Sequence, residues 1–108
     1  MAVDYTARLV GGYILPYDRY EIAVKDAVAA DFFPEVIEGH LEKLDEYSET
    51  SDYILSSHWY AIAGPGEANR ISEIPEVEYR RPSEMVRRMA IAMGIELSYG
   101  IYLVLRAW

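Results

Sequence analysis

Near the C-terminus, apolar side chains occupy every second position of the chain. A period of two with one fully apolar face is typical of a β-strand that packs against a core on one side. The pattern therefore predicts a strand over residues 96–108, the most apolar of the chain, with its odd-numbered face buried. The residues of that face are Ile95, Leu97, Tyr99, Ile101, Leu103 and Leu105.

Two further segments have the pattern of strands. Tyr5–Leu15 alternates, but the pair Gly11–Gly12 interrupts it, which predicts a β-bulge or a close approach of another backbone. Residues 51–63 are apolar on both faces, which indicates a central strand or a sheet that is covered on both sides. Residues 71–79 are a weaker candidate, because Pro75 would confine a strand there to a sheet edge.

Helical spacing of apolar residues predicts three helices, over residues 19–30, 34–49 and 84–93. Asp18 stands where its side chain would cap the first helix, and Gly94 stands where a glycine commonly ends the third. The second helix has apolar residues on one side and a row of acids on the other, so we expect its acidic side to face solvent.

These elements follow the order β-α-α-β-(β)-α-β. We expect an α+β fold in a single domain, residues 1–108, with helices packed on an antiparallel sheet of three to four strands. The ferredoxin-like arrangement is one version of this fold, because merging the first two helices gives its β-α-β-β-α-β order. That version requires a central third strand, whereas the third candidate here contains a proline.

Composition narrows the class of protein. The 108 residues are 52% hydrophobic and 26% charged, which is the composition of a folded globular chain. Cysteine is absent, so disulfides and thiolate metal sites are excluded. No apolar run approaches the ~18 residues that span a bilayer. We therefore expect a cytoplasmic protein without a membrane partner.

The charge is strongly acidic, with 18 acids against 10 bases and a net charge of −8. This balance disfavours direct binding to nucleic acid, because phosphates would be repelled. Residues 31–52 contain eight of the acids and a single base, Lys43. On the predicted second helix, the candidate partner-binding residues are Glu35, Glu38, Glu42, Asp45, Glu46 and Glu49.

Such a row of like charges favours a small non-enzymatic protein that binds a basic surface of another protein, because a basic partner would relieve the repulsion. The sharpest form of this hypothesis is an inhibitor or nucleic-acid mimic of the phage accessory type.

A different function is indicated by the arginines. Half of the basic residues lie within Arg70–Arg88, and all of these are arginine. Arginine makes bidentate contacts to carboxylate or phosphate and stacks on aromatic rings. The alternative is therefore a binder of a small anionic ligand or nucleotide. Its candidate residues are Arg80, Arg81, Arg87, Arg88, His58 and Tyr60.

Motifs that would specify catalysis or metal binding are lacking. His40 and His58 are the only histidines, and neither has the spacing of a metal ligand. We expect no catalytic residue, no metal and no cofactor. A small dimeric enzyme that uses His58 is a further alternative, because Ser56, His58 and Tyr60 share one face of a strand.

Self-association is expected because two of the predicted strands carry apolar residues on both of their faces. The even-numbered face of the last strand contains Tyr102, Val104 and Trp108, and Ile54 and Ile62 lie on a second apolar face of residues 51–63. One helical layer covers only one face of a sheet, so some of these side chains should meet a second copy in a homodimer.

Overall fold

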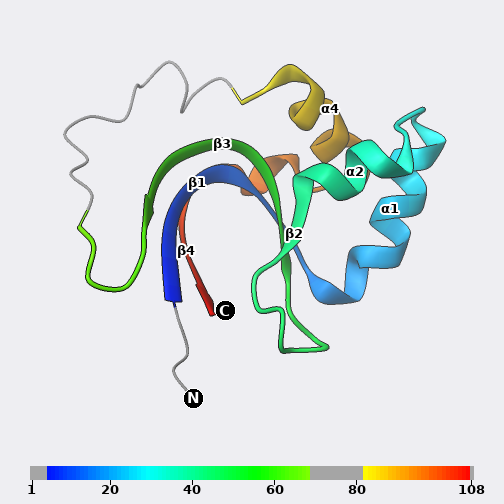
Figure 1. The fold of residues 1–108 in the computed structure, drawn as a ribbon. Helices are drawn as coiled ribbons and strands as arrows, with labels where there is room; N and C mark the ends of the chain where they lie inside the picture. Colours follow the sequence, from blue (N-terminus) through cyan, green and yellow to red (C-terminus); the bar gives the residue numbers. More distant parts are fainter. Residues whose placement is uncertain (1–4, 69–81, 108) are drawn as a thin grey trace.

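The computed structural model describes residues 5–68 and 82–107. Within these ranges the chain forms four strands and three helices in the order β-α-α-β-β-α-β, with the helices packed against a strongly curled antiparallel sheet (Figure 1). The α+β class and the antiparallel sheet predicted from the sequence are confirmed.

The strands are β1 (Tyr5–Leu15), β2 (Leu41–Lys43), β3 (Tyr53–Ala63) and β4 (Gly100–Ala107). The helices are α1 (Tyr20–Ala29), α2 (Pro34–His40) and α4 (Glu84–Met93). Two short 3₁₀ turns, η1 (Tyr17–Arg19) and η2 (Glu96–Ser98), precede α1 and β4.

The strand order across the sheet is β2-β3-β1-β4, and every neighbouring pair is antiparallel. Two register shifts interrupt the pairing of β1 with β3, and one of them falls between Gly11 and Gly12. A β-carbon on Gly12 would lie 2.5 Å from the carbonyl oxygen of Leu55, so the two backbones touch there. The bulge and the close approach predicted for Gly11–Gly12 are both confirmed.

The main core lies between the helices and one face of the sheet. Small and large apolar side chains alternate across it, with Ala23 and Ala27 of α1 facing the bulkier residues of α4. Its buried residues are Tyr13, Leu15, Ala23, Ala27, Ile37, Leu55, Val86, Met89, Ala90, Met93 and Ile95. The methionines of α4 fill the space beside these alanines, a role that suits a flexible thioether side chain.

A second, smaller core lies on the opposite face of the sheet, inside its curl. Val10, Ile54 and Val104 are buried there, although no helix packs on this face among the described residues. Tyr102 and Leu44 pack against this cluster, together with Ile14. Because β3 is central and buries Ile54 on one face and Leu55 on the other, the prediction of a central strand over residues 51–63 is confirmed.

The last strand differs from its prediction. Residues 96–98 form η2, and the buried side chain of β4 is the even-numbered Val104, which is 4% exposed. The odd-numbered Leu103 and Leu105 are 73% and 61% exposed, and Leu97 is 96% exposed. The predicted buried face is therefore wrong at Leu97, Leu103 and Leu105, whereas Ile95 is buried and Tyr99 packs against the main core as predicted. The reason is tertiary, because the helices cover only one end of that face while the curl buries the other face.

The second predicted helix is also shorter than expected. It ends at His40, and Leu41–Lys43 continue as β2, which pairs with Tyr53–Leu55. Gly39 lowers the helix propensity just before this change by about 1 kcal/mol relative to alanine. The fourth strand therefore comes from within the predicted helix. The weak candidate at 71–79 lies outside the described residues.

The helix ends agree with the sequence only in part. α4 spans the predicted residues and ends at Gly94, whose φ of 74° is the left-handed conformation common at helix C-termini. At its start, the backbone N–H of Ser83 donates to the hydroxyl oxygen of Ser57 at 2.6 Å, which fastens α4 to β3. The predicted cap at Asp18 is wrong, because Arg19 precedes α1 and no side chain caps the helix.

Because Gly12 stands where the two central strands touch, Gly12→Ala should lower the free energy of unfolding by about 1–3 kcal/mol through forced backbone movement. Gly39→Ala is the matched control: nothing lies within 4 Å of its β-carbon position, so alanine should stabilise α2 by about 0.5–1 kcal/mol. Urea denaturation of both variants measures the difference, and equal effects would contradict the role of Gly12.

Candidate functional site

The six acids predicted to form one helical row are divided among three structural elements. Glu35 and Glu38 are exposed on α2, and Glu42 lies on β2. The other three, Asp45, Glu46 and Glu49, belong to the turn between β2 and β3. The prediction that all six share one helix face is wrong, because the helix ends at His40.

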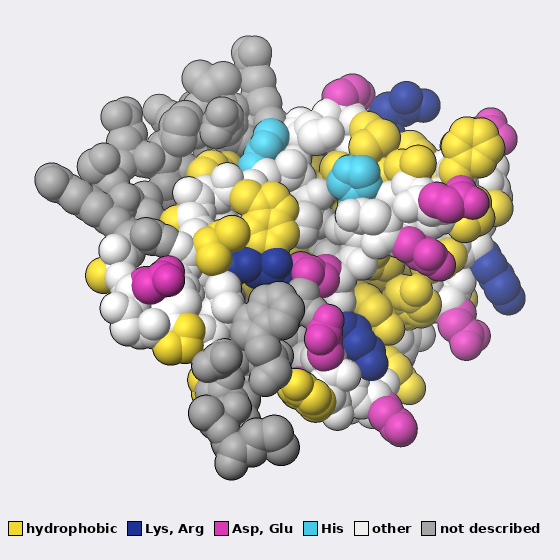
Figure 2. Space-filling model, viewed as in Figure 1, with side chains coloured by type: hydrophobic (Ala, Val, Ile, Leu, Met, Phe, Trp, Pro, Cys, Tyr) yellow, Lys and Arg dark blue, Asp and Glu magenta, His cyan; other side chains and the backbone are white. Residues whose placement is uncertain are grey.

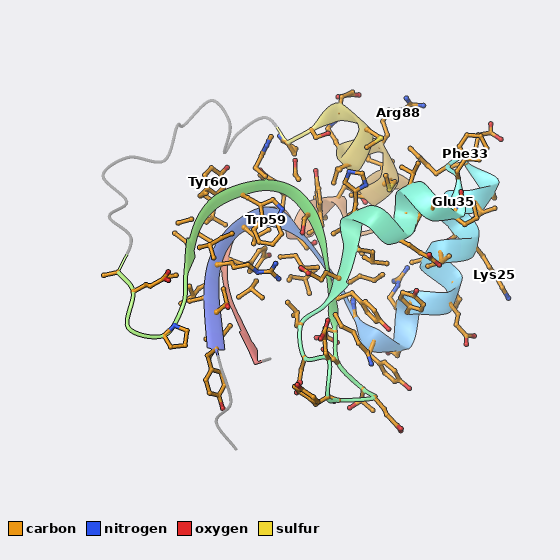
Figure 3. The ribbon with its side chains drawn as sticks, viewed as in Figure 1. Lys25, Phe33, Glu35, Trp59, Tyr60 and Arg88 are labelled. Atoms are coloured by element: carbon orange, nitrogen blue, oxygen red, sulfur yellow. The ribbon has the colours of Figure 1, made fainter. Side chains whose placement is uncertain are left out.

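Glu42 is engaged inside the curl of the sheet. Its carboxylate pairs with the guanidinium of Arg8 at 2.7 Å, and the two side chains are only 28% and 11% exposed. The same guanidinium stacks on the ring of Trp59 at 4.1 Å (Figure 3). The Nε atom of Arg8 is buried without a hydrogen-bond partner within residues 5–68 and 82–107. Glu42 therefore neutralises a buried cation instead of facing a partner.

Asp45 also has a local role. Its backbone N–H donates to the hydroxyl of the buried Ser51 at 2.8 Å, and its carboxylate accepts a hydrogen bond from the backbone N–H of Tyr47 at 3.0 Å. These contacts close the turn between β2 and β3. A carboxylate that accepts a backbone hydrogen bond two residues further on is a common turn device.

The helices α1 and α2 carry four of the exposed acids. Glu21 and Asp26 of α1 are exposed, as are Glu35 and Glu38 of α2, and we call these four the acidic helical surface. Acidic and hydrophobic side chains are interspersed over this side of the molecule (Figure 2). Lys25 lies among them as a single base of α1.

Large apolar side chains accompany these acids. Phe33, at the start of α2, is 71% exposed, and Ile22 of α1 is 60% exposed. Phe33 and Glu35 lie together at the outer edge of the helical side of the molecule (Figure 3). An exposed aromatic residue bordered by carboxylates is an arrangement that protein interfaces use, with the ring at the centre and charges at the rim.

The two described arginines of this group, Arg87 and Arg88, do not converge on one site. Arg87 pairs with Glu84 at 3.3 Å, whereas the guanidinium of Arg88 lies 5.8 Å from the ring of Phe32, towards α1 and α2. Arg80 and Arg81 lie outside the described residues. Sequence reasoning grouped all four, but successive residues on a helix point about 100° apart.

The two candidate residues of β3 lie close to each other. The rings of His58 and Tyr60 are tilted with their centroids 6.4 Å apart. The hydroxyl oxygens of Tyr60 and Tyr99 both lie within 3.3 Å of the position that a β-carbon on Gly11 would take. The lack of a side chain on Gly11 therefore makes room for two tyrosine hydroxyls.

A pocket of about 640 Å³ lies beside α4, next to these tyrosines. Among the described residues that line it, Arg87 contributes a positive charge, and Glu84 and Glu96 contribute negative charges. The residues that line it are Tyr13, Pro82, Glu84, Arg87, Ile91, Glu96 and Tyr99. Sequence reasoning identified Arg87 and missed Tyr13 and Tyr99, although the ratio of ten tyrosines to two phenylalanines was a signal of polar-tipped surfaces.

Tyr13 is the unusual residue of this pocket. It is only 1% exposed, and its ring packs on that of Tyr99 with centroids 5.0 Å apart. Burial raises the pKa of its hydroxyl, Arg87 partly opposes that rise, and Glu84 adds to it. The hydroxyl is therefore a neutral hydrogen-bond donor at neutral pH, held between an apolar interior and two charged side chains.

Within the described residues, no group of three or more histidine, cysteine or acidic side chains could hold a metal ion. One ring nitrogen of His40 lies 2.8 Å from the carbonyl oxygen of Val36, one turn earlier in α2. The described helices include none that is long and apolar enough to cross a bilayer.

Comparison of the chain with protein-family models, with curated proteins and with solved structures gave no match.

Because Glu42 neutralises the buried Arg8, Glu42→Gln should lower the free energy of unfolding by about 1–3 kcal/mol. Glu84→Gln removes the other described acid–arginine pair, which is largely exposed, and should change stability by less than about 0.5 kcal/mol. Denaturation at neutral pH compares the two variants. If both have the stability of the native chain, Glu42 is a surface acid and remains available to a partner.

Proposed function

We propose that this protein is a non-enzymatic binding protein that docks its acidic helical surface on a basic surface of another protein. The observation that carries the proposal is the position of the exposed Phe33 next to Glu35, on the side where α1 and α2 present four carboxylates. Phe33 would enter an apolar depression of the partner, and the carboxylates would pair with arginine or lysine around it.

The six acids that the sequence placed on one predicted helix take different roles in this proposal. Glu35 and Glu38 remain at the interface, and Glu21 and Asp26 join them from α1. Glu42 does not belong to the interface, because its ion pair with Arg8 holds its carboxylate inside the curl of the sheet. Asp45, Glu46 and Glu49, on the turn at the far end of β2, form at most the margin of the contact.

Electrostatics would govern the rate of association more than the final affinity. Complementary charge accelerates encounter, and salt weakens it because the Debye length at physiological ionic strength is only about 8 Å. A surface of this sign attracts proteins that themselves bind nucleic acid. Competition with nucleic acid for such a partner, as an inhibitor of the phage accessory type, is the sharpest form of the proposal.

Charge reversal tests this proposal. Glu35→Lys combined with Glu38→Lys should weaken capture of the partner from a lysate of the source organism by about ten-fold or more, equivalent to about 1.4 kcal/mol, while the fold remains intact. Capture by the native chain should also decline as salt is raised from 0.05 to about 0.5 M.

The control combines Glu46→Lys with Glu49→Lys, which makes the same change of charge on the turn. This turn variant should still capture most of the partner. If the turn variant loses the partner and the α2 variant keeps it, the interface lies elsewhere and the acidic helical surface is only a solvated surface.

A second function, binding of a small anionic ligand, is supported by the pocket beside α4. Tyr13 lines this pocket although it is almost fully buried, and its ring packs on that of Tyr99. Its hydroxyl would donate a hydrogen bond to the bound ligand. Arg87 would supply the positive charge once it exchanges Glu84 for the ligand.

The charges of the pocket narrow the class of ligand. Glu84 and Glu96 would repel a triphosphate, so a singly charged carboxylate fits better than a nucleotide. Tyr13, Tyr99 and Ile91 would pack against a planar apolar body. An aromatic carboxylate has both features.

Thermal unfolding with benzoate, 4-hydroxybenzoate and AMP tests the ligand proposal. An aromatic carboxylate should raise the melting temperature in a saturable way, because a ligand that binds only the folded state stabilises it. The increase should disappear in Arg87→Gln and persist in Arg88→Gln, whose side chain lies near Phe32. Equal increases in both variants would exclude the pocket as the binding site.

The dimeric enzyme with His58 receives no support of this kind. The register shift at Gly11–Gly12 pairs Ser56 with Gly12 and His58 with Gly11, so these two residues of β3 do not share one face as the sequence predicted.

The fold itself permits a finer proposal. We infer a strongly curled version of the ferredoxin-like arrangement, in which α1 and α2 together replace the first helix. The order β-α-β-β-α-β and the central position of the third strand support it. The three-residue β2 and the pronounced curl are departures from that arrangement.

A further inference from the structure

One end of the sheet presents an apolar face that the helices do not reach. It lies on the same side of the sheet as the main core, at the end away from α1, α2 and α4 (Figure 1). Strand register places seven residues there, which we call the bare sheet face: Tyr5, Ala7, Leu9, Ala61, Ala63, Leu103 and Leu105. None of these side chains is charged.

The side chains of this face are most exposed on β4, the outer strand. Leu103 and Leu105 are more than half exposed, and Tyr5 is nearly so. The central strands contribute alanines, so the face is shallow in the middle and bordered by leucine on β4. Contiguous exposed apolar surface of this kind is uncommon on soluble monomers and marks an interaction site.

The outer edge of β4 is a second, independent feature. β4 is an edge strand of eight residues, and no strand pairs with its outer side in the described part of the chain. It contains no proline, and Arg106 is the one charged residue in its sequence, so it has few of the features that natural edge strands use to prevent pairing. The opposite edge, β2, has only three residues and offers a much shorter template.

We propose that these two features form the interface of a homodimer, in which β4 pairs antiparallel with β4 of a second copy. A twofold axis through β4 satisfies the free backbone groups of both edges at once. It also places Leu103 and Leu105 beside their counterparts on one continuous face, because residues opposite each other in antiparallel strands share a face.

Charge selects a second copy over a basic partner. Two chains of net charge −8 repel over most of their surfaces, but the bare sheet face brings no like charges together. A basic protein would gain no ion pairs on this uncharged surface and would have to desolvate its own charges. The basic partner therefore belongs on the acidic helical surface.

This interface differs from the one that the sequence suggested. Val104 and Ile54, expected to meet a second copy, are buried in the second core of the same chain. Association through the opposite face of β4 requires neither the acidic helical surface nor the pocket, so it is independent of the proposed function.

The molecular mass of the full chain in solution tests the proposal. Light scattering after gel filtration should give twice 12.4 kDa at high concentration and approach 12.4 kDa on dilution. Leu103→Lys should weaken association by about 100-fold, because it places one charge from each copy on the joined apolar face near the twofold axis. The exposed position of Leu103 predicts that this variant stays folded by circular dichroism.

Leu97→Lys is the matched control, since Leu97 is even more exposed but lies on η2, outside the sheet. It should dimerise like the native chain. A native chain that stays at 12.4 kDa at the highest concentration would overturn the proposal, as would equal dissociation of both variants. Unfolding of Leu103→Lys would overturn it too, because the residue would then belong to the core of a single chain.

Hydrogen exchange distinguishes β4 pairing from association through another surface. Amides of β4 in the native chain should become more protected as concentration rises, and those of Leu103→Lys should not. A dimer whose β4 amides exchange at a rate independent of concentration would place the interface elsewhere and refute the β4 pairing.

Discussion

The contact between β1 and β3 at Gly12 determines the shape of the molecule. Only glycine lets the two backbones approach so closely, since any β-carbon would collide with the carbonyl oxygen of Leu55. Two register shifts just before this contact, between Leu9 and Val10 and between Gly11 and Gly12, place extra residues of β3 against β1, which increases bending and twist. The sheet therefore curls, and its two faces acquire different environments.

The curl gives this small chain two cores. The helices bury one face at one end of the sheet, while the other face closes on itself around Val10, Ile54 and Val104. The curl also carries Arg8 into the interior, where a buried cation is costly unless it is paired. Glu42 and Trp59 compensate that cost.

The two proposed interfaces lie on different parts of the molecule. The acidic helical surface is on α1 and α2 beside the exposed Phe33, whereas the bare sheet face contains no charged side chain. A basic partner and a second copy would therefore use different surfaces and could bind together. The pocket beside α4 lies between these regions, with Tyr13 as its most buried polar group.

The sequence by itself determined the α+β class, the strands β1 and β3, the whole of α4 and the glycine contact, because each depends on local periodicity or backbone geometry. It also identified Arg87 as a candidate ligand residue. Only the tertiary structure decided which face of β4 is buried, since both faces are apolar and the curl selects Val104 over Leu103. The same holds for Glu42. Its helical spacing placed it in an acidic row, but residues 41–43 pair with β3 as a strand, and its carboxylate meets Arg8, 34 positions earlier in the chain. No local pattern encodes contacts at such separations.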